Sequence, residues 1–83
     1  MSSMDALEQY NTVFSDALGI APDRVGGDLR FGATPEWDSV AQMELISRME
    51  TAFGIVLDVD ALMELDSYAA GKEILSSKYG VAL

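Results

Sequence analysis

Residues 35–54 decide the fold, and they read Pro-Glu-Trp-Asp-Ser-Val-Ala-Gln-Met-Glu-Leu-Ile-Ser-Arg-Met-Glu-Thr-Ala-Phe-Gly. Apolar side chains recur in this stretch at the spacing of one helix face, which is typical of a half-buried helix. The predicted buried stripe consists of Met43, Ile46, Met49 and Phe53, flanked by Leu45. The pattern therefore predicts a helix over residues 39–53, ended by Gly54.

Ser39 begins this predicted helix, and its position supports two interpretations. A serine at the N-cap with Gln42 three residues later matches a capping box, so Ser39 could serve only to start the helix. A helix N-terminus also carries free N–H groups and a partial positive charge, which suit a phosphate ester on that hydroxyl. The residues alone leave both interpretations open.

Upstream, a helix is predicted over residues 4–18. Ser2 with Asp5 reads as a capping box at its start, and Gly19 follows its last apolar residue as a stop. Its apolar face is Leu7, Tyr10, Phe14, Ala17 and Leu18. Pro and Gly residues then mark residues 19–38 as a loop of about 20 residues, a length that is uncommon and tends to be functional. The apolar residues expected to anchor this loop are Ile20, Val25, Leu29, Phe31 and Trp37.

Downstream, residues 55–57 are apolar but have no partner strand, so we interpret them as a buried connector. A short helix is predicted over residues 58–66, with Asp58 or Asp60 as its cap and with Leu62, Met63 and Leu65 facing inward. The last helix is predicted over residues 67–78, with Asp66 or Ser67 as its cap and Gly80 as its stop. Its candidate core is Tyr68, Ala69, Ile74 and Leu75.

Gly71 lies inside the last predicted helix, where glycine costs about 1 kcal/mol relative to alanine. Close approach of a neighbouring element would explain it. Together the patterns predict an all-α fold, a small four-helix bundle of three main helices and a short third one. A long loop joins the first two helices, and residues 1–83 are expected to form a single domain.

The charge and the missing residue types narrow the function. There are 14 acidic residues against 5 basic ones, so the net charge of −9 disfavours nucleic acids and anionic membranes and attracts basic protein surfaces. The chain has no Cys, which excludes disulfides, thiolate metal sites and a Cys nucleophile, and no His, which excludes a Ser-His-Asp triad. No apolar run is long enough to span a bilayer, and no signal peptide pattern begins the chain. We expect a cytoplasmic monomer that is not an enzyme.

Asp58 and Asp60 suggest a calcium loop, but the spacing fails. Met63 stands where the loop needs glycine, and Ala69 stands where it needs an acid. Helix capping explains both aspartates better, so no metal site is predicted.

On these residues the chain resembles the acyl carrier protein family, which includes the peptidyl and D-alanyl carriers. Asp38-Ser39-Val40 is similar to the family's Asp-Ser-Leu motif. The resemblance extends over nearly the whole chain through Leu18-Gly19-Ile20 to Val25 upstream and Met43, Leu45, Met49, Phe53-Gly54 and Ile55 downstream.

The resemblance implies that Ser39 carries a 4′-phosphopantetheine arm, and that Asp38 helps a phosphopantetheinyl transferase hold Mg²⁺ at its interface. Val40, Glu44 and Glu50 would face partner enzymes, which load and process acyl groups and carry basic docking patches. Thr51 stands where many family members have a further acid, so the resemblance does not extend to that contact.

Trp37 separates this chain from the Gly-Ala-Asp-Ser-Leu form of housekeeping fatty-acid carriers and is similar to carriers of specialised pathways. We therefore expect an acyl carrier protein of a specialised fatty-acid or polyketide pathway, holding its cargo as a thioester. A peptidyl or D-alanyl carrier is the nearest alternative, and an unmodified acidic bundle that binds basic proteins is another.

Met43 and Met49, with Met63 nearby, predict an adaptable core. Such a core could admit an acyl chain between the second and fourth helices, although methionine as ordinary core filler is an equally good interpretation.

Overall fold

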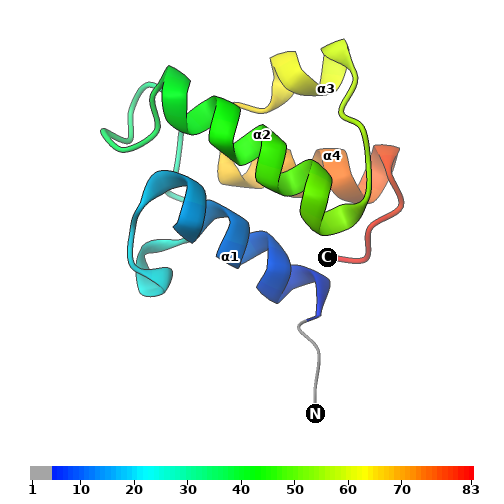
Figure 1. Ribbon diagram of the computed structural model, residues 1–83, viewed down its shortest axis with the longest axis horizontal. Coiled ribbons are helices and arrows are strands. Elements are labelled where there is room, and N and C mark those ends of the chain that lie inside the picture. The colour runs from blue at the N-terminus through cyan, green and yellow to red at the C-terminus, as the bar shows by residue number, and fades with distance from the viewer. Residues whose placement is uncertain (1–4) are drawn as a thin grey trace.

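The computed structural model describes residues 5–83, and within them the chain is helical with no strand beyond a single bridge between Arg30 and Ser67. Its elements are α1 (Ala6–Leu18), the short 3-10 helix η1 (Pro22–Arg24), α2 (Ser39–Phe53), α3 (Val59–Glu64) and α4 (Tyr68–Lys78). Figure 1 shows α1 packed along α2, with α4 behind them and α3 beyond α2. This confirms the predicted all-α four-helix bundle with a long loop between its first two helices. Of the described helices, none has both the length and the apolar character needed to cross a bilayer.

Short polar side chains start every α-helix of the described chain. Asp5 caps α1 and forms a reciprocal capping box with Glu8, so α1 begins one residue after Asp5. The predicted start at residue 4 and Ser2, proposed for that capping box, both lie outside the described residues. Asp58 caps α3 and Ser67 caps α4, as one of the two alternatives predicted in each case.

Two glycines end the long helices as predicted. Gly19 closes α1 with φ 67°, and Gly54 closes α2 with φ 64°. In this left-handed conformation each glycine N–H donates to a carbonyl of the last helical turn, which satisfies a group that would otherwise lack a partner.

The core is built around an aromatic cluster. Phe14 contacts Tyr10, Trp37 and Tyr68 with ring centroids 5.0, 5.3 and 5.4 Å apart. Trp37 is only 1% exposed although it belongs to the long loop, so the loop is anchored in the core as predicted. Of the other predicted anchors, Ile20 and Leu29 are buried and Val25 is half-buried. Phe31 is the exception, since it is 44% exposed.

The predicted buried face of α2 was wrong in part. Met43 is 73% exposed, and Ala41 instead lies on the inner face with Leu45 and Met49. The inner face of α2 is fixed by α1, which packs along it, and small residues such as Ala41 allow that approach. The same error recurs elsewhere: Met63 is 79% exposed while Ala61 is buried, Leu7 and Ala69 are exposed, and Val13 was missed as a core residue. The predicted methionine-rich core therefore reduces to Met49.

Two side chains of α2 hold the two ends of α3. Glu50 Oε2 accepts from Leu57 N at 2.9 Å, just before α3 begins. Gln42 Nε2 donates to Leu65 O at 3.0 Å, just after α3 ends. The later α2 residue holds the earlier end of α3, so the two helices run antiparallel. The spacing is eight residues on both sides, which corresponds to about 12 Å along α2.

Gly71 is kept by close packing, as the sequence suggested. The Tyr10 hydroxyl donates to Tyr68 O at 2.5 Å and occupies the space that a Cβ at Gly71 would need. Burial raises the pKa of Tyr10 far above its usual value, so this hydroxyl stays protonated and can donate.

Candidate functional site at the start of α2

The start of α2 is capped by Asp38, not by Ser39. Asp38 has the extended backbone of an N-cap residue, with φ −107° and ψ −170°, and its Oδ1 accepts from Ala41 N at 2.9 Å. Ser39 is the first residue inside the helix. The predicted capping box between Ser39 and Gln42 is therefore wrong, because the carboxylate of Asp38 already holds the orphan N–H that a cap would bind.

This correction changes what Ser39 can do. Its side chain is exposed, and within residues 5–83 its hydroxyl makes no hydrogen bond. The backbone N–H groups of Ser39 and Val40 also find no acceptor in that part of the chain. A hydroxyl free of capping duty, beside two free N–H groups at the positive end of a 15-residue helix, suits an esterified phosphate.

Trp37 connects this turn to the core of the bundle. Its ring lies between Phe14 at 5.3 Å and Phe31 at 6.3 Å, measured between centroids, and its backbone N donates to Thr34 O at 2.9 Å. Its indole Nε1 donates to Gln42 Oε1 at 2.6 Å. Sequence reasoning expected Trp37 to be buried but missed this hydrogen bond, since no pattern within the chain indicates which partner a buried indole will find.

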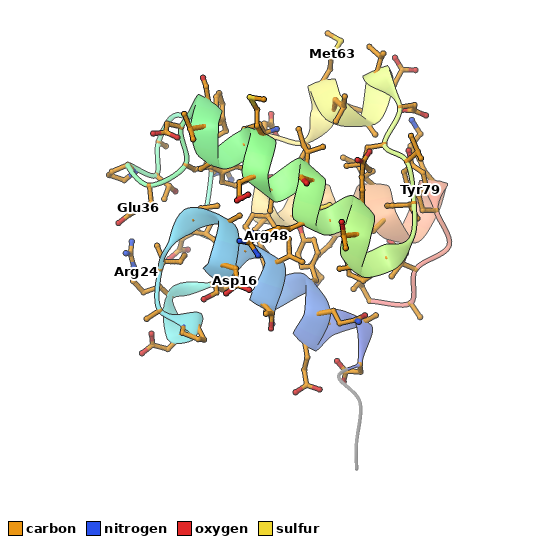
Figure 2. All side chains as sticks on the ribbon, in the orientation of Figure 1. Asp16, Arg24, Glu36, Arg48, Met63 and Tyr79 are labelled. Carbon is orange, nitrogen blue, oxygen red and sulfur yellow. The ribbon has the colours of Figure 1, made fainter. Side chains whose placement is uncertain are left out.

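An exposed ion pair also holds the loop. Arg24 of η1 forms a bidentate ion pair with Glu36, in which Nη1 lies 2.9 Å from Oε2 and Nη2 lies 3.4 Å from Oε1. The hydrogen bonds from Arg24 lower the pKa of Glu36. Figure 2 shows the two side chains meeting across the loop just before Trp37. An exposed pair of this kind adds little stability, so we assign it the local role of joining η1 to the segment that leads into α2.

The three residues predicted to face partners occupy different settings. Val40 is 77% exposed, an unusual place for a valine, and Glu44 is exposed with Arg48 Nε at 3.6 Å. Glu50 is half-buried, and one of its oxygens already accepts from Leu57 N. Only its other oxygen is left to meet a partner's cation.

The surface also carries apolar side chains that sequence reasoning missed. Met43 on α2 is exposed, and so are Val56 before α3 and both Val59 and Met63 on it. Figure 2 shows Met63 directed away from the bundle. The missed signal was that the apolar positions of α2 exceed one helix face, so some had to point outward once the inner face was filled.

A groove between α1 and α2 lies away from Ser39. It has a volume of about 430 Å³, and its lining includes Thr12, Asp16, Ser47 and Arg48. Arg48 and Asp16 approach to 3.8 Å across it (Figure 2). Ser47, the lining residue of α2 nearest to Ser39 along the chain, is eight residues further on, or about 12 Å of helix rise. We therefore do not count the groove as part of the site.

The described residues offer no metal centre and no catalytic set. No group of three or more Asp and Glu side chains gathers among residues 5–83 in a way that could hold a metal ion. With neither His nor Cys in the sequence, the site presents a hydroxyl, a carboxylate and helix N–H groups. Such a set can accept a covalent group, and its only basic group, the Asp38 carboxylate, is already engaged as the cap of α2.

Comparison with known proteins identifies what is attached to such sites. Residues 8–70 match the family described as "Phosphopantetheine attachment site". The chain is also 27% identical over 78 residues to the "Acyl carrier protein" of Guillardia theta, covering 94% of this chain and 96% of that protein. No solved structure matches the chain significantly.

Proposed function

The chain belongs to the phosphopantetheine-binding acyl carrier protein family, and on that premise we propose that Ser39 is the residue to which the arm is attached. The family's cofactor is a covalent 4′-phosphopantetheine, which supplies a terminal thiol that can form a thioester with cargo. The observation that carries the assignment is the hydroxyl of Ser39, exposed at the first helical position and relieved of capping by Asp38.

The attachment is a group transfer from coenzyme A. An O–P bond forms between Ser39 Oγ and the phosphorus of the phosphopantetheine half, and the O–P bond of the pyrophosphate linkage breaks. Adenosine 3′,5′-bisphosphate leaves, and the proton of the hydroxyl passes to a base of the transferase, since the Asp38 carboxylate is engaged in capping α2. The Asp38 carboxylate lies next to Ser39 in sequence, where it can help hold Mg²⁺ at the shared interface.

A carrier needs no catalytic residues of its own. A thioester on a tethered arm raises the effective concentration of cargo at each enzyme that docks, and the enzyme supplies the chemistry. This role is consistent with a site that has one modifiable hydroxyl beside a carboxylate that caps the helix, and we propose that the protein is not an enzyme.

We place the docking surface around Val40, Glu44 and Glu50, extended by the exposed Met43 on the same helix. Apolar side chains beside carboxylates suit a partner that combines an apolar pocket with Arg or Lys residues. The net charge of −9 would steer such a partner toward the carrier. The partners are a phosphopantetheinyl transferase and enzymes that load and process the cargo.

For the cargo we propose an acyl group of a specialised fatty-acid or polyketide pathway, supported by the Trp-Asp-Ser form of the motif. Charging of the modified chain by an acyl-loading enzyme, and not by an enzyme that adenylates amino acids or D-alanine, is the expected result. The reverse result would assign the chain to the peptidyl or D-alanyl carriers.

Intact-protein mass spectrometry tests the attachment site. After incubation with coenzyme A, Mg²⁺ and a broad-specificity phosphopantetheinyl transferase, the wild-type chain is expected to gain the mass of one phosphopantetheine. Ser39→Ala is expected to gain none. Ser47→Ala, an exposed serine two turns later on the same helix, is the matched control and should be modified like the wild type. Modification of Ser39→Ala, or no gain in the wild type, would show that the assignment is wrong.

A further inference from the structure

We propose that Gln42 is a positioning residue for the attachment of the arm, an inference that rests on the proposed function of Ser39. Gln42 lies three residues after Ser39 in the first turn of α2, and its side chain is half-buried. It joins three segments of the molecule: the long loop through Trp37, α2 through its own backbone, and the end of α3 through Leu65.

The two hydrogen bonds of Gln42 fix the orientation of its amide. An indole N–H can only donate and a carbonyl oxygen can only accept, so Oε1 must face Trp37 and Nε2 must face Leu65. The distances are 2.6 and 3.0 Å, respectively. A carboxylate could accept from Trp37 but could not donate to Leu65 O. An apolar side chain could do neither.

Both partners of Gln42 depend on it because both are buried. Trp37 is 1% exposed and Leu65 is 3% exposed. Each group makes no other side-chain hydrogen bond within residues 5–83. Removal of the amide would leave a buried donor and a buried acceptor unpaired, which favours a shift of the loop or of α3 that restores water to them.

The link between Trp37 and Gln42 encloses Asp38 and Ser39. The indole is packed in the aromatic core, and Gln42 is fixed in α2, so the four residues between them, Asp38 and Ser39 among them, are held from both sides. Ser39 must reach the phosphorus of coenzyme A while the carrier is docked, and an error of about 1 Å in such a geometry can slow a reaction by up to roughly 100-fold. The hydrogen bond between Trp37 and Gln42 thus gives the exposed Ser39 hydroxyl a defined position, although that hydroxyl makes no hydrogen bond itself.

Steady-state kinetics of the transferase reaction test this role. Gln42→Met keeps the length of the side chain and removes both hydrogen bonds. We expect kcat for attachment to fall about tenfold while KM changes less than about twofold, because the docking surface is untouched. Gln9→Met is the matched control, since Gln9 is a half-buried helical glutamine whose side chain makes no hydrogen bond in residues 5–83. It should retain the wild-type kcat.

The single tryptophan provides a direct readout of the hydrogen bond. Trp37 gives the only indole N–H resonance in a ¹H–¹⁵N spectrum, and this resonance should move in Gln42→Met but not in Gln9→Met. A second variant, Trp37→Phe, removes the indole donor together with part of the buried ring while it keeps an aromatic side chain in the core, and it should lower kcat at least to the same degree. In the double variant the two decreases in kcat should not add, since either substitution alone removes the hydrogen bond between Trp37 and Gln42.

The outcomes separate this inference from the proposed function. If the wild type is modified at Ser39 but Gln42→Met and Trp37→Phe keep the wild-type kcat, Gln42 is structural only and the inference is wrong. If Gln42→Met does not fold, Trp37→Phe decides in the same way. If the wild-type chain gains no arm, the proposed function fails and this inference falls with it.

Discussion

Asp38 caps α2, and in the proposed function the same carboxylate also helps to hold Mg²⁺. Its carboxylate caps α2 by accepting from Ala41 N, and by doing so it frees the neighbouring Ser39 hydroxyl. A cap needs only an oxygen acceptor, which asparagine supplies about as well as aspartate. A role in holding Mg²⁺ needs the negative charge. The two roles can therefore be separated by one substitution.

We expect Asp38→Asn to retain most of the stability but to slow attachment of the arm. The free energy of unfolding should change by less than about 0.5 kcal/mol, because the cap is preserved. The value of kcat/KM for the transferase should fall by about tenfold or more, because the substitution removes the charge that we propose helps to hold Mg²⁺. Urea denaturation and transferase kinetics measure the two effects.

Asp58→Asn is the matched control, since Asp58 caps α3 with the same bond to the N–H three residues on. It should leave the transferase kinetics unchanged. Equal transferase kinetics for Asp38→Asn and the wild type would show that Asp38 acts only as a cap.

At the scale of elements, α3 depends on side chains from other parts of the chain for its stability. Being six residues long, it is too short to be stable by itself, and its two ends are held by Glu50 and Gln42 of α2. Its start is further tied to the end of α4, because Asp58 N donates to the Tyr79 hydroxyl at 3.0 Å and Lys78 Nζ lies 3.2 Å from Asp58 Oδ1. The packing of α3 thus depends on side chains from α2 and from the end of α4.

Asp58 makes this element sensitive to acid. The hydrogen bond from Ala61 N, and then the one from Lys78, lower the pKa of Asp58 below its usual value of 3.8. A carboxyl whose pKa is lower in the folded state stabilises the fold above the unfolded-state pKa. That contribution is lost as the pH falls through the folded-state pKa. We therefore expect the stability difference between the wild type and Asp58→Asn to be largest near neutral pH and to shrink below pH 3.8.

Urea unfolding at a series of pH values measures this difference. Asp60→Asn removes a charge from the same helix turn but no hydrogen bond within the described residues, and it should show a smaller change with pH. A stability difference for Asp58→Asn that does not vary with pH would contradict the assignment.

At the scale of the whole molecule, we propose that the net charge guides basic partners toward the site. There are 14 acidic and 5 basic residues, and three of the basic ones, Arg24, Arg48 and Lys78, are paired with carboxylates within the chain. The surplus negative charge is thus left to attract partners from a distance, while the apolar side chains near Ser39 act only on contact.

We expect the KM of the transferase for the carrier to rise with salt while kcat stays nearly constant. Raising the ionic strength from about 0.05 M to about 0.5 M shortens the Debye length from roughly 14 Å to roughly 4 Å, which screens the long-range attraction. Glu44→Gln should reduce the salt dependence, because Glu44 is an exposed carboxylate on the proposed docking surface. A KM independent of salt would argue against electrostatic docking.

The sequence by itself determined the order of the helices and the limits of α2. Residues 39–53 were predicted as a helix and are one, because caps and left-handed glycines act on neighbouring residues in the chain. It also singled out Ser39, through the Asp-Ser motif at a helix start. The resemblance to the carrier family, now confirmed, came from the same local patterns.

Only the tertiary structure decided which side of each helix is buried and which polar groups meet. Met43 and Met63 were predicted inside and lie outside, since the inner face of a helix depends on where its neighbours pack. The pairing of Gln42 with Trp37 and Leu65 joins residues up to 23 positions apart, beyond the reach of any local pattern. Capping by Asp38 required the actual backbone angles, and those angles left the Ser39 hydroxyl free.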